Sequence, residues 1–365
     1  MRHGNHGGIY NPSEITKLMD HVFNSKGDSL PVCIWGGHGV GKTELVKGYC
    51  REKGWQFAYC APAQFEEMGD LHGMPEVCTL DADPTNKVTK FFPPEWVPVA
   101  PGPGVLLLDD FNRAEDRILR GIMQLFQTRG LFSWKLPEGW KIVCTANPDN
   151  GVYSVTTLDD AMLTRMFHCS MEFNANNWAN WALANNIDSR GIDFVLAYPE
   201  AVTGKKTTPR SLVQFFNLIS GISDLQASVD LVSKLARGLL DEQTVSSFMS
   251  FVRNELECLL SPIDILQPKP GIDIEATILN TIKWKDGHIR VDRLSTIIDR
   301  LLMYLASGDY KFNPIHCTNL ARFIEIDGVP RDLKTRLGTE ISKLDGEARK
   351  LHKNKAIADV LLATL

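Results

Sequence analysis

The sequence predicts an α/β fold in the first half of the chain and a mainly helical second half. Before Phe173, short apolar runs alternate with longer segments, several of which space their apolar residues as a helix does. Residues 105–108 are apolar at every position, which is typical of a strand buried on both faces of a parallel sheet. After Phe173, apolar residues recur three and four positions apart, as on one face of a helix.

The expected elements of the first half follow in chain order. Asn11 and Pro12 open an amphipathic helix, since asparagine caps helices and proline suits their first turn. The opening eight residues are rich in glycine, and we expect them to form an unstructured tail. Strands are expected at residues 31–35, 56–60, 105–108, 141–145 and 167–173, and helices at 43–53 and 117–127.

We expect three domains. We expect residues 1–173 to form an α/β domain, residues 174–265 a helical domain, and residues 266–365 a helical C-terminal region of unknown role. The second boundary rests on Pro268, Pro270 and Gly271, because this segment interrupts helical patterning.

The composition narrows the classes of function. Lys and Arg number 39 and Asp and Glu 44, which gives a formal net charge of -5. The chain as a whole therefore lacks the strong positive charge with which proteins bind a nucleic-acid backbone. The 8 cysteines are scattered without the spacing of zinc ligands, and we interpret them as reduced, mostly buried thiols. With no leader and no apolar stretch of roughly 20 residues, a cytoplasmic location without membrane contact is expected.

A phosphate-binding loop is the strongest motif. Gly36-x-x-x-x-Gly41-Lys42-Thr43 follows an apolar run and opens a helix-like segment, as this pattern requires. Glycines let backbone amides turn toward a phosphate, the lysine neutralises phosphate oxygens, and the threonine hydroxyl holds Mg²⁺. We therefore expect ATP and Mg²⁺ to bind here, with Lys42 on a solvent-facing loop. The residues expected to bind the nucleotide are Gly36, Gly37, His38, Gly39, Val40, Gly41, Lys42 and Thr43.

Polar residues follow two other expected strands, at the edge where such sheets bind ligands. Asp109 is expected to hold Mg²⁺ with Thr43, and Asp110 to orient or deprotonate the attacking water. Asn147 is placed to position that water or to contact the γ-phosphate. Taken alone, an Asp-Asp pair is as often an ordinary strand end, and Asn-Pro is more often a turn.

Together, these motifs resemble the MoxR branch of the AAA+ ATPases over roughly residues 30–215. The resemblance implies a P-loop AAA+ core with a parallel sheet, followed by a helical lid. It also implies that residues 64–94 are an insert in the second helix and that residues 129–140 form a hairpin, both facing the channel of a ring. The resemblance is carried by Gly-Gly-His-Gly-Val-Gly-Lys-Thr at 36–43, Gly-Asp-Leu-His-Gly at 69–73, Leu-Asp-Asp-Phe-Asn-Arg-Ala at 108–114, Thr-Ala-Asn-Pro at 145–148, Leu-Asp-Asp-Ala-Met-Leu-Thr-Arg-Met at 158–166 and Thr-Pro-Arg at 208–210.

Two arginines receive roles from this resemblance. Arg165 stands where the family places the arginine finger that reaches a neighbouring subunit's γ-phosphate, and Arg210 stands at the second sensor on the lid. The alternative for either is a surface salt bridge, the usual state of a lone arginine. Asp110 departs from the family, which usually has glutamate there. Aspartate is one methylene shorter, so slow hydrolysis remains an open alternative.

The leading hypothesis is an ATPase of MoxR type that remodels or activates a partner protein as a ring, most simply a hexamer. The resemblance implies a protein substrate or a partner with a von Willebrand factor A domain on a separate chain, since no Asp-x-Ser-x-Ser stretch occurs here. One alternative is a nucleic-acid motor or remodelling ATPase, which the acidic net charge disfavours. Another is a slow nucleotide-gated switch.

Overall fold

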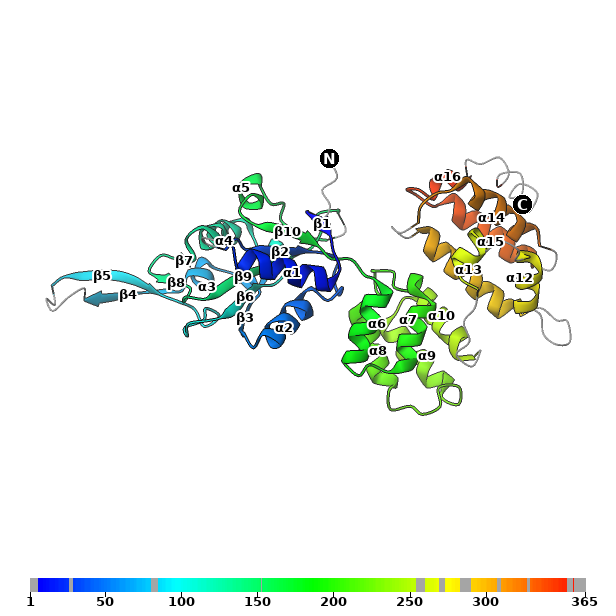
Figure 1. The fold of residues 1–365 in the computed structure, drawn as a ribbon, viewed down its shortest axis with the longest axis horizontal. Helices are drawn as coiled ribbons and strands as arrows, with labels where there is room; N and C mark the ends of the chain where they lie inside the picture. The colour runs from blue at the N-terminus through cyan, green and yellow to red at the C-terminus, as the bar shows by residue number, and fades with distance from the viewer. Residues whose placement is uncertain are drawn as a thin grey trace. The chain divides into compact units, whose positions relative to one another are not determined.

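The computed structural model divides the chain into two compact units, residues 1–173 and residues 174–365 (Figure 1). The expected boundary between a lid and a C-terminal region falls within the second unit and stays a prediction. The residues that the structure describes are 6–25, 29–79, 85–151, 153–253, 260–268, 273–282, 290–306, 310–326, 329–352 and 357.

A parallel sheet of six strands forms the centre of the first unit, in the order β1-β10-β2-β9-β6-β3. All five expected strands are present, although the last ends at Ser170 rather than at residue 173. Because the strands are parallel, their carboxyl ends share one edge of the sheet. The strands are β1 (Gly8–Ile9), β2 (Val32–Trp35), β3 (Gln56–Cys60), β6 (Gly104–Leu108), β9 (Trp140–Ala146) and β10 (Phe167–Ser170).

The strand β1 corrects the expectation of an unstructured N-terminal tail. Gly8 and Ile9 pair with Cys169 and Ser170 at one edge of the sheet. The His6 ring lies 4.5 Å from the ring of Trp35, and its carbonyl accepts a hydrogen bond from Ser170 Oγ. Backbone pairing and one aromatic contact therefore order a segment whose composition alone favours disorder. Residues 1–5 lie outside the described residues.

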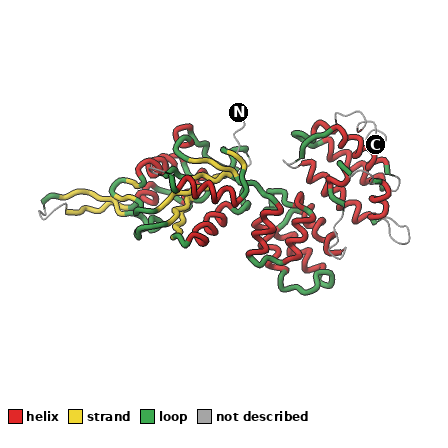
Figure 2. Tube along the Cα trace, in the orientation of Figure 1, coloured by secondary structure: helices red, strands yellow, loops and turns green. Residues whose placement is uncertain are grey.

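Helices cover both faces of the sheet, as Figure 2 shows for the first unit. On one face, α1 (Pro12–Phe23) and α2 (Lys42–Lys53) pack against the inward side chains of β2, β6 and β9. On the other face, α3 (Met68–His72) and α4 (Asp116–Thr128) pack against the alternate side chains of the same strands. Burial on both faces explains why residues 105–108 carry no polar side chain. The expected α/β class, a parallel sheet flanked by helices and followed by helical segments, is thus confirmed.

One hairpin lies in the segment expected to be an insert, residues 64–94, and a second in the segment expected to be a hairpin, residues 129–140. The longer pairs β4 (Met74–Thr79) with β5 (Lys87–Phe92), and Figure 1 shows it projecting from the first unit. The shorter pairs β7 (Gly130–Leu131) with β8 (Trp134–Lys135). The rings of Phe91 and Phe132 stack with their centres 4.6 Å apart, which joins the base of the longer hairpin to the turn of the shorter one.

The second unit is helical throughout the residues described. Its first part has an aromatic core in which Phe248 contacts Phe194 and Phe215 at 5.0 and 4.9 Å between ring centres. The helices are α6 (Ala175–Ala184), α7 (Ser189–Ala197), α8 (Pro209–Ile219), α9 (Val229–Leu239), α10 (Glu242–Arg253), α11 (Pro262–Leu266), α12 (Ile274–Ile282), α13 (Val291–Ala306), α14 (Pro314–Glu325), α15 (Arg331–Ser342) and α16 (Arg349–His352).

A buried arginine connects the two helical parts of this unit. Arg300 on α13 is 1% exposed and pairs with Glu200, which is 3% exposed. Its Nη1 and Nη2 donate to the carbonyls of Leu260 and Ala197, and its guanidinium lies 4.0 Å from the ring centre of Tyr198. Removing one member of such a pair leaves a buried charge without compensation, so the contact holds α13 against the end of α7 and the turn at Glu200.

The cysteine thiols behave as expected where the structure describes them. Cys33, Cys60 and Cys144 are buried within the sheet, and burial raises the pKa of each thiol, which keeps it protonated. Cys258 lies outside the described residues.

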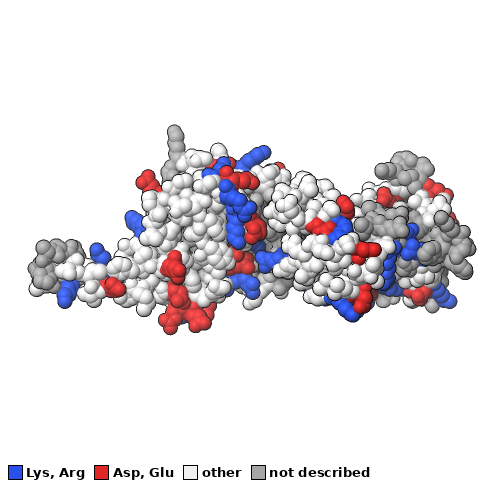
Figure 3. Space-filling model, turned by 90° about the horizontal axis from the view of Figure 1, so that it is seen from below, with Lys and Arg blue, Asp and Glu red and all other residues white. Residues whose placement is uncertain are grey.

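Basic and acidic side chains are interspersed over the face shown in Figure 3. Within the described residues, no helix combines the length and the apolar character needed to cross a bilayer.

Candidate nucleotide-binding site

The loop from Gly36 to Gly41 joins the central strand β2 to the first turn of α2. Gly39 and Gly41 have φ of 69° and 107°, in the left-handed region that favours glycine. A Cβ on Gly36 would lie 2.5 Å from the carbonyl oxygen of Met171, which is too close. Glycine is therefore required at these positions, for the left-handed turns and for the close approach of the loop to Met171. The loop leads into the N-terminus of α2, and helix N-termini bind anions through their backbone amides.

Lys42 is buried beneath this loop, which corrects the expectation that it faces solvent. Its side chain is 5% exposed, because the ammonium sits among acceptors of the loop itself. Nζ donates to the carbonyls of Gly36 at 2.7 Å and Gly37 at 3.1 Å, and to Oδ1 of Asn147 at 3.1 Å. The structure thus brings together the predicted lysine and the predicted asparagine.

Asp109, which directly follows β6, accepts hydrogen bonds from three hydroxyl groups. Thr43 Oγ1 lies 2.9 and 3.1 Å from its two carboxylate oxygens, Thr145 Oγ1 donates to Oδ1 at 2.6 Å, and Tyr59 donates to Oδ2 at 3.2 Å. Burial, and then the nearby Asp109 charge, raise the pKa of Tyr59, so this phenol keeps its proton. A carboxylate beside a threonine hydroxyl is the donor set that holds Mg²⁺ in P-loop sites, so Thr43 and Asp109 fit that ion.

Asp110 has an unusual backbone and an accessible side chain. Its φ of 48° and ψ of 39° are left-handed, which is uncommon for a residue with a side chain. The carboxylate is 37% exposed and lies 4.0 Å from Lys42 Nζ and from Arg113 Nη1. This carboxylate can therefore meet a water molecule beside the lysine, which Asp109, held by three hydroxyls, is less free to do.

Asn112 fixes the backbone of Asn147 through a reciprocal pair of hydrogen bonds. Its Nδ2 donates to the Asn147 carbonyl at 2.8 Å, and the Asn147 amide donates back to Asn112 Oδ1 at 3.1 Å. Both side chains are buried at 1% exposure, so the Asn147 carboxamide is held next to Lys42. Sequence reasoning missed Asn112, although its place two residues after Asp110 was a usable signal.

Tyr153 covers the outer part of the loop. The backbone amide of His38 donates to the Tyr153 hydroxyl at 3.3 Å, and the His38 Nδ1 lies 3.2 Å from the same oxygen. The two rings meet edge to face with their centres 5.7 Å apart. No local pattern in the sequence indicated this contact, because Tyr153 comes from the loop after β9.

Neither predicted arginine takes part in the hydrogen bonds of the loop described above. Arg165 stands between α5 (Asp160–Leu163) and β10, where its guanidinium donates to the Ala161 carbonyl and to the carboxamide oxygen of Gln127. It precedes Phe167, which pairs with Val32 at the start of β2, whereas the loop follows the end of β2. Arg165 is therefore at the opposite edge of the sheet from its own chain's phosphate-binding loop.

Arg210 is the second residue of α8 in the second unit. It is exposed, and it forms no hydrogen bond or ion pair with the part of the chain that the structure describes. Its role as a second sensor stays a prediction.

Comparison with known proteins gives only distant structural likeness. No protein-family model and no curated protein matches the chain. Among solved structures, the Thermotoga maritima RuvB Holliday junction branch migration motor is 12% identical, with a TM-score of 0.40, covering 69% of this chain and 78% of that chain. A putative ATPase from Cytophaga hutchinsonii is 11% identical, with a TM-score of 0.33, covering 79% of this chain and 74% of that one. Likeness of this degree assigns neither a family nor an activity.

The buried lysine gives the first prediction. Lys42→Met keeps the length of the side chain but removes the ammonium, and charge-assisted hydrogen bonds contribute about 1.5 to 3 kcal/mol each. We expect ATP affinity, measured by calorimetry, to fall about 100-fold or more. Lys53→Met at the far end of α2 is the matched control, because Lys53 pairs with Asp20 instead, and it should bind ATP normally. Unchanged affinity in a folded Lys42→Met protein would show that the loop is not the nucleotide site.

Proposed function

We propose that this protein binds Mg²⁺-ATP at the loop between β2 and α2 and hydrolyses it. One observation carries this proposal: Lys42 contacts Asn147, and Thr43 contacts Asp109, at the shared carboxyl edge of three neighbouring strands. An ammonium, an amide, a hydroxyl and a carboxylate gathered beside a glycine loop are the parts that P-loop nucleotide sites use.

The surroundings of each residue indicate its role in binding or in hydrolysis. The loop amides and the Lys42 ammonium hold the phosphates, while Thr43 and Asp109 hold the Mg²⁺, which neutralises charge on the phosphate oxygens. Asp110 is the more exposed carboxylate and orients or deprotonates the attacking water. Asn147, fixed by Asn112, positions the same water or contacts the γ-phosphate.

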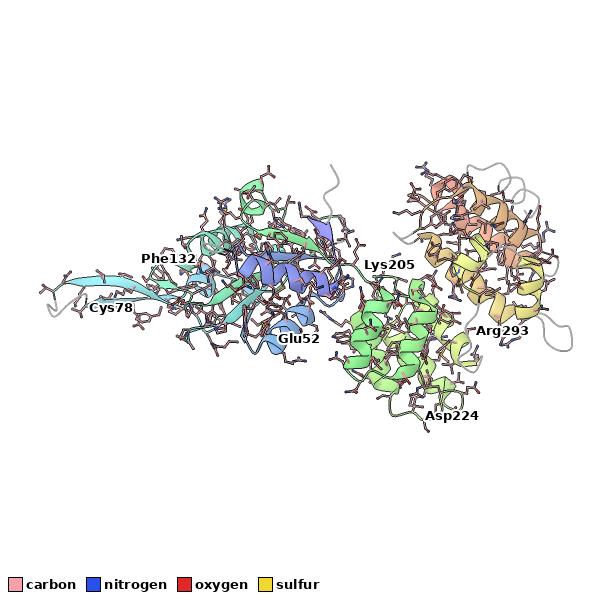
Figure 4. All side chains as sticks on the ribbon, in the orientation of Figure 1. Glu52, Cys78, Phe132, Lys205, Asp224 and Arg293 are labelled. Carbon is pink, nitrogen blue, oxygen red and sulfur yellow. The ribbon has the colours of Figure 1, made fainter. Side chains whose placement is uncertain are left out.

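The resemblance to MoxR-type AAA+ ATPases extends the proposal to a ring that remodels or activates another protein. The two hairpins of the first unit support contact with another protein, because they carry exposed apolar side chains. These are Met74, Val77, Phe92 and Phe132. Figure 4 labels Phe132 on the loop between β7 and β8. A von Willebrand factor A domain on a separate chain is the partner that the resemblance suggests. The net charge of -5 makes a nucleic-acid motor the weaker proposal.

Asp110 provides the test of hydrolysis as distinct from binding. Asp110→Asn should bind Mg²⁺-ATP within about threefold of the parent but lower kcat by about 100-fold or more, since general-base assistance typically contributes 10²–10⁴-fold. The control is Asp116→Asn on α4, where an exposed carboxylate pairs with Arg120, and its kcat should be unchanged. Turnover of Asp110→Asn at the parent rate would exclude Asp110 as the group that activates water.

Arg165 provides the test of the ring. Arg165 lies at the edge of the sheet opposite to the loop, so as an arginine finger it would act at the site of a neighbouring subunit. Arginine fingers supplied by a second protein chain contribute about 10³–10⁵-fold in rate in other phosphoryl-transfer systems. Arg165→Ala and Lys42→Met should each be nearly inactive alone. Mixed in equal amounts, they should recover about a quarter of the parent activity, since about one interface in four then joins an intact loop to an intact arginine.

Co-assembly of the two variants is checked by pull-down of one tagged variant by the other. If they co-assemble without recovery of activity, Arg165 is a structural arginine that holds Ala161 and Gln127 in place.

A further inference from the structure

The hydroxyl of Thr145 is the only side-chain group, among the described residues, that bonds to both Asp109 and Asp110. Thr145 lies near the end of β9 and is fully buried, at 0% exposure. Its Oγ1 donates to Asp109 Oδ1 at 2.6 Å and accepts the backbone N–H of Asp110 at 2.7 Å. A threonine hydroxyl has one proton, and an amide can only donate, so the direction of both hydrogen bonds is fixed.

The position of Thr145 follows from strand register. On β9, Cys144 pairs with Leu108, the last residue of β6, so Thr145 is the first residue beyond that pairing. The Asp109 amide still reaches a backbone acceptor, the Cys60 carbonyl at 2.8 Å on the other side. The Asp110 amide instead uses the Thr145 side chain, exactly where the chain leaves the sheet and enters its left-handed turn.

This hydrogen bond bears on the direction of the Asp110 carboxylate. A left-handed conformation is less favourable than a right-handed one for a residue with a side chain, so contacts of its backbone help to maintain it. The hydrogen bond from the Asp110 amide to the Thr145 hydroxyl is such a contact. Losing that hydroxyl would leave the N–H without its acceptor. If the turn relaxes, the carboxylate of Asp110 changes direction with the backbone.

We propose that Thr145 is a positioning residue for ATP hydrolysis, which sets the metal-binding carboxylate of Asp109 and the water-activating carboxylate of Asp110 relative to one another. This inference rests on the hydrolytic function proposed above. Thr145 touches neither nucleotide nor water in this scheme and acts only through the two aspartates. Its loss should therefore slow the chemical step more than it weakens binding.

The test compares Thr145→Val, which keeps the shape but removes the hydroxyl, with Thr145→Ser, which keeps the hydroxyl. For Mg²⁺-ATP, Thr145→Val should lower kcat by about tenfold or more while KM changes by less than about threefold. Thr145→Ser should restore kcat to within about threefold of the parent, because both hydrogen bonds can form again.

A matched control separates this role from the general effect of losing a buried hydroxyl. Thr244 in the second unit is also fully buried, and its hydroxyl also bridges two partners, Thr207 Oγ1 and the Ala201 carbonyl. Thr244→Val should lower the melting temperature but leave kcat unchanged. If Thr145→Val does not fold, Thr145→Cys takes its place with the same expectation, since a thiol is a weak donor and acceptor.

Equal kcat for the parent and Thr145→Val, or a Thr145→Ser protein as slow as Thr145→Val, would overturn the positioning role and leave the proposed hydrolysis intact. A parent protein that binds Mg²⁺-ATP without any turnover would overturn the hydrolytic function, and this inference with it.

Discussion

The parallel pairing of β9 with both β2 and β6 is the constraint on which the site depends. It aligns Trp35 with Ala146 and Leu108 with Cys144, so the residues that follow all three strands emerge at one edge of the sheet. Lys42, Asp109 and Asn147 are far apart in the sequence and meet only because of this register. A slip of one residue would turn alternate side chains to the other face and separate them.

The sequence was sufficient for those parts of the site that a local pattern specifies. The glycine loop, Lys42 and Thr43 form one continuous motif, and Asp109 and Asn147 each follow a strand that its apolar run identifies. Thr145 and Tyr59 could not be found in this way, because their importance lies in a partner that follows another strand, the carboxylate of Asp109. The burial of Lys42 was missed for a related reason, since its acceptors become visible only when the loop is folded back over it.

The same distinction applies to the fold. Strands and helices with strong periodicity lie within a few residues of their expected places, whereas the N-terminal strand was mistaken for a tail because its stability comes from pairing with β10. In the second unit, helical spacing was readable, but the buried contact of Arg300 with Glu200 was not. That contact ties α13 to α7 and to the turn that follows it, because Arg300 also donates to the Ala197 carbonyl. Because the pair is almost completely buried, desolvation raises the pKa of Glu200 despite the opposing charge of Arg300.

The proposed function depends most directly on whether Thr43 and Asp109 together bind Mg²⁺ beside a bound nucleotide. Calorimetric titration of ATP into the unmodified protein, with Mg²⁺ and then with a chelator, measures this. The account predicts one ATP per chain, with a Kd below about 100 µM in Mg²⁺ and at least about tenfold weaker binding without it. Absence of binding at millimolar ATP, or an affinity that does not depend on Mg²⁺, would contradict it.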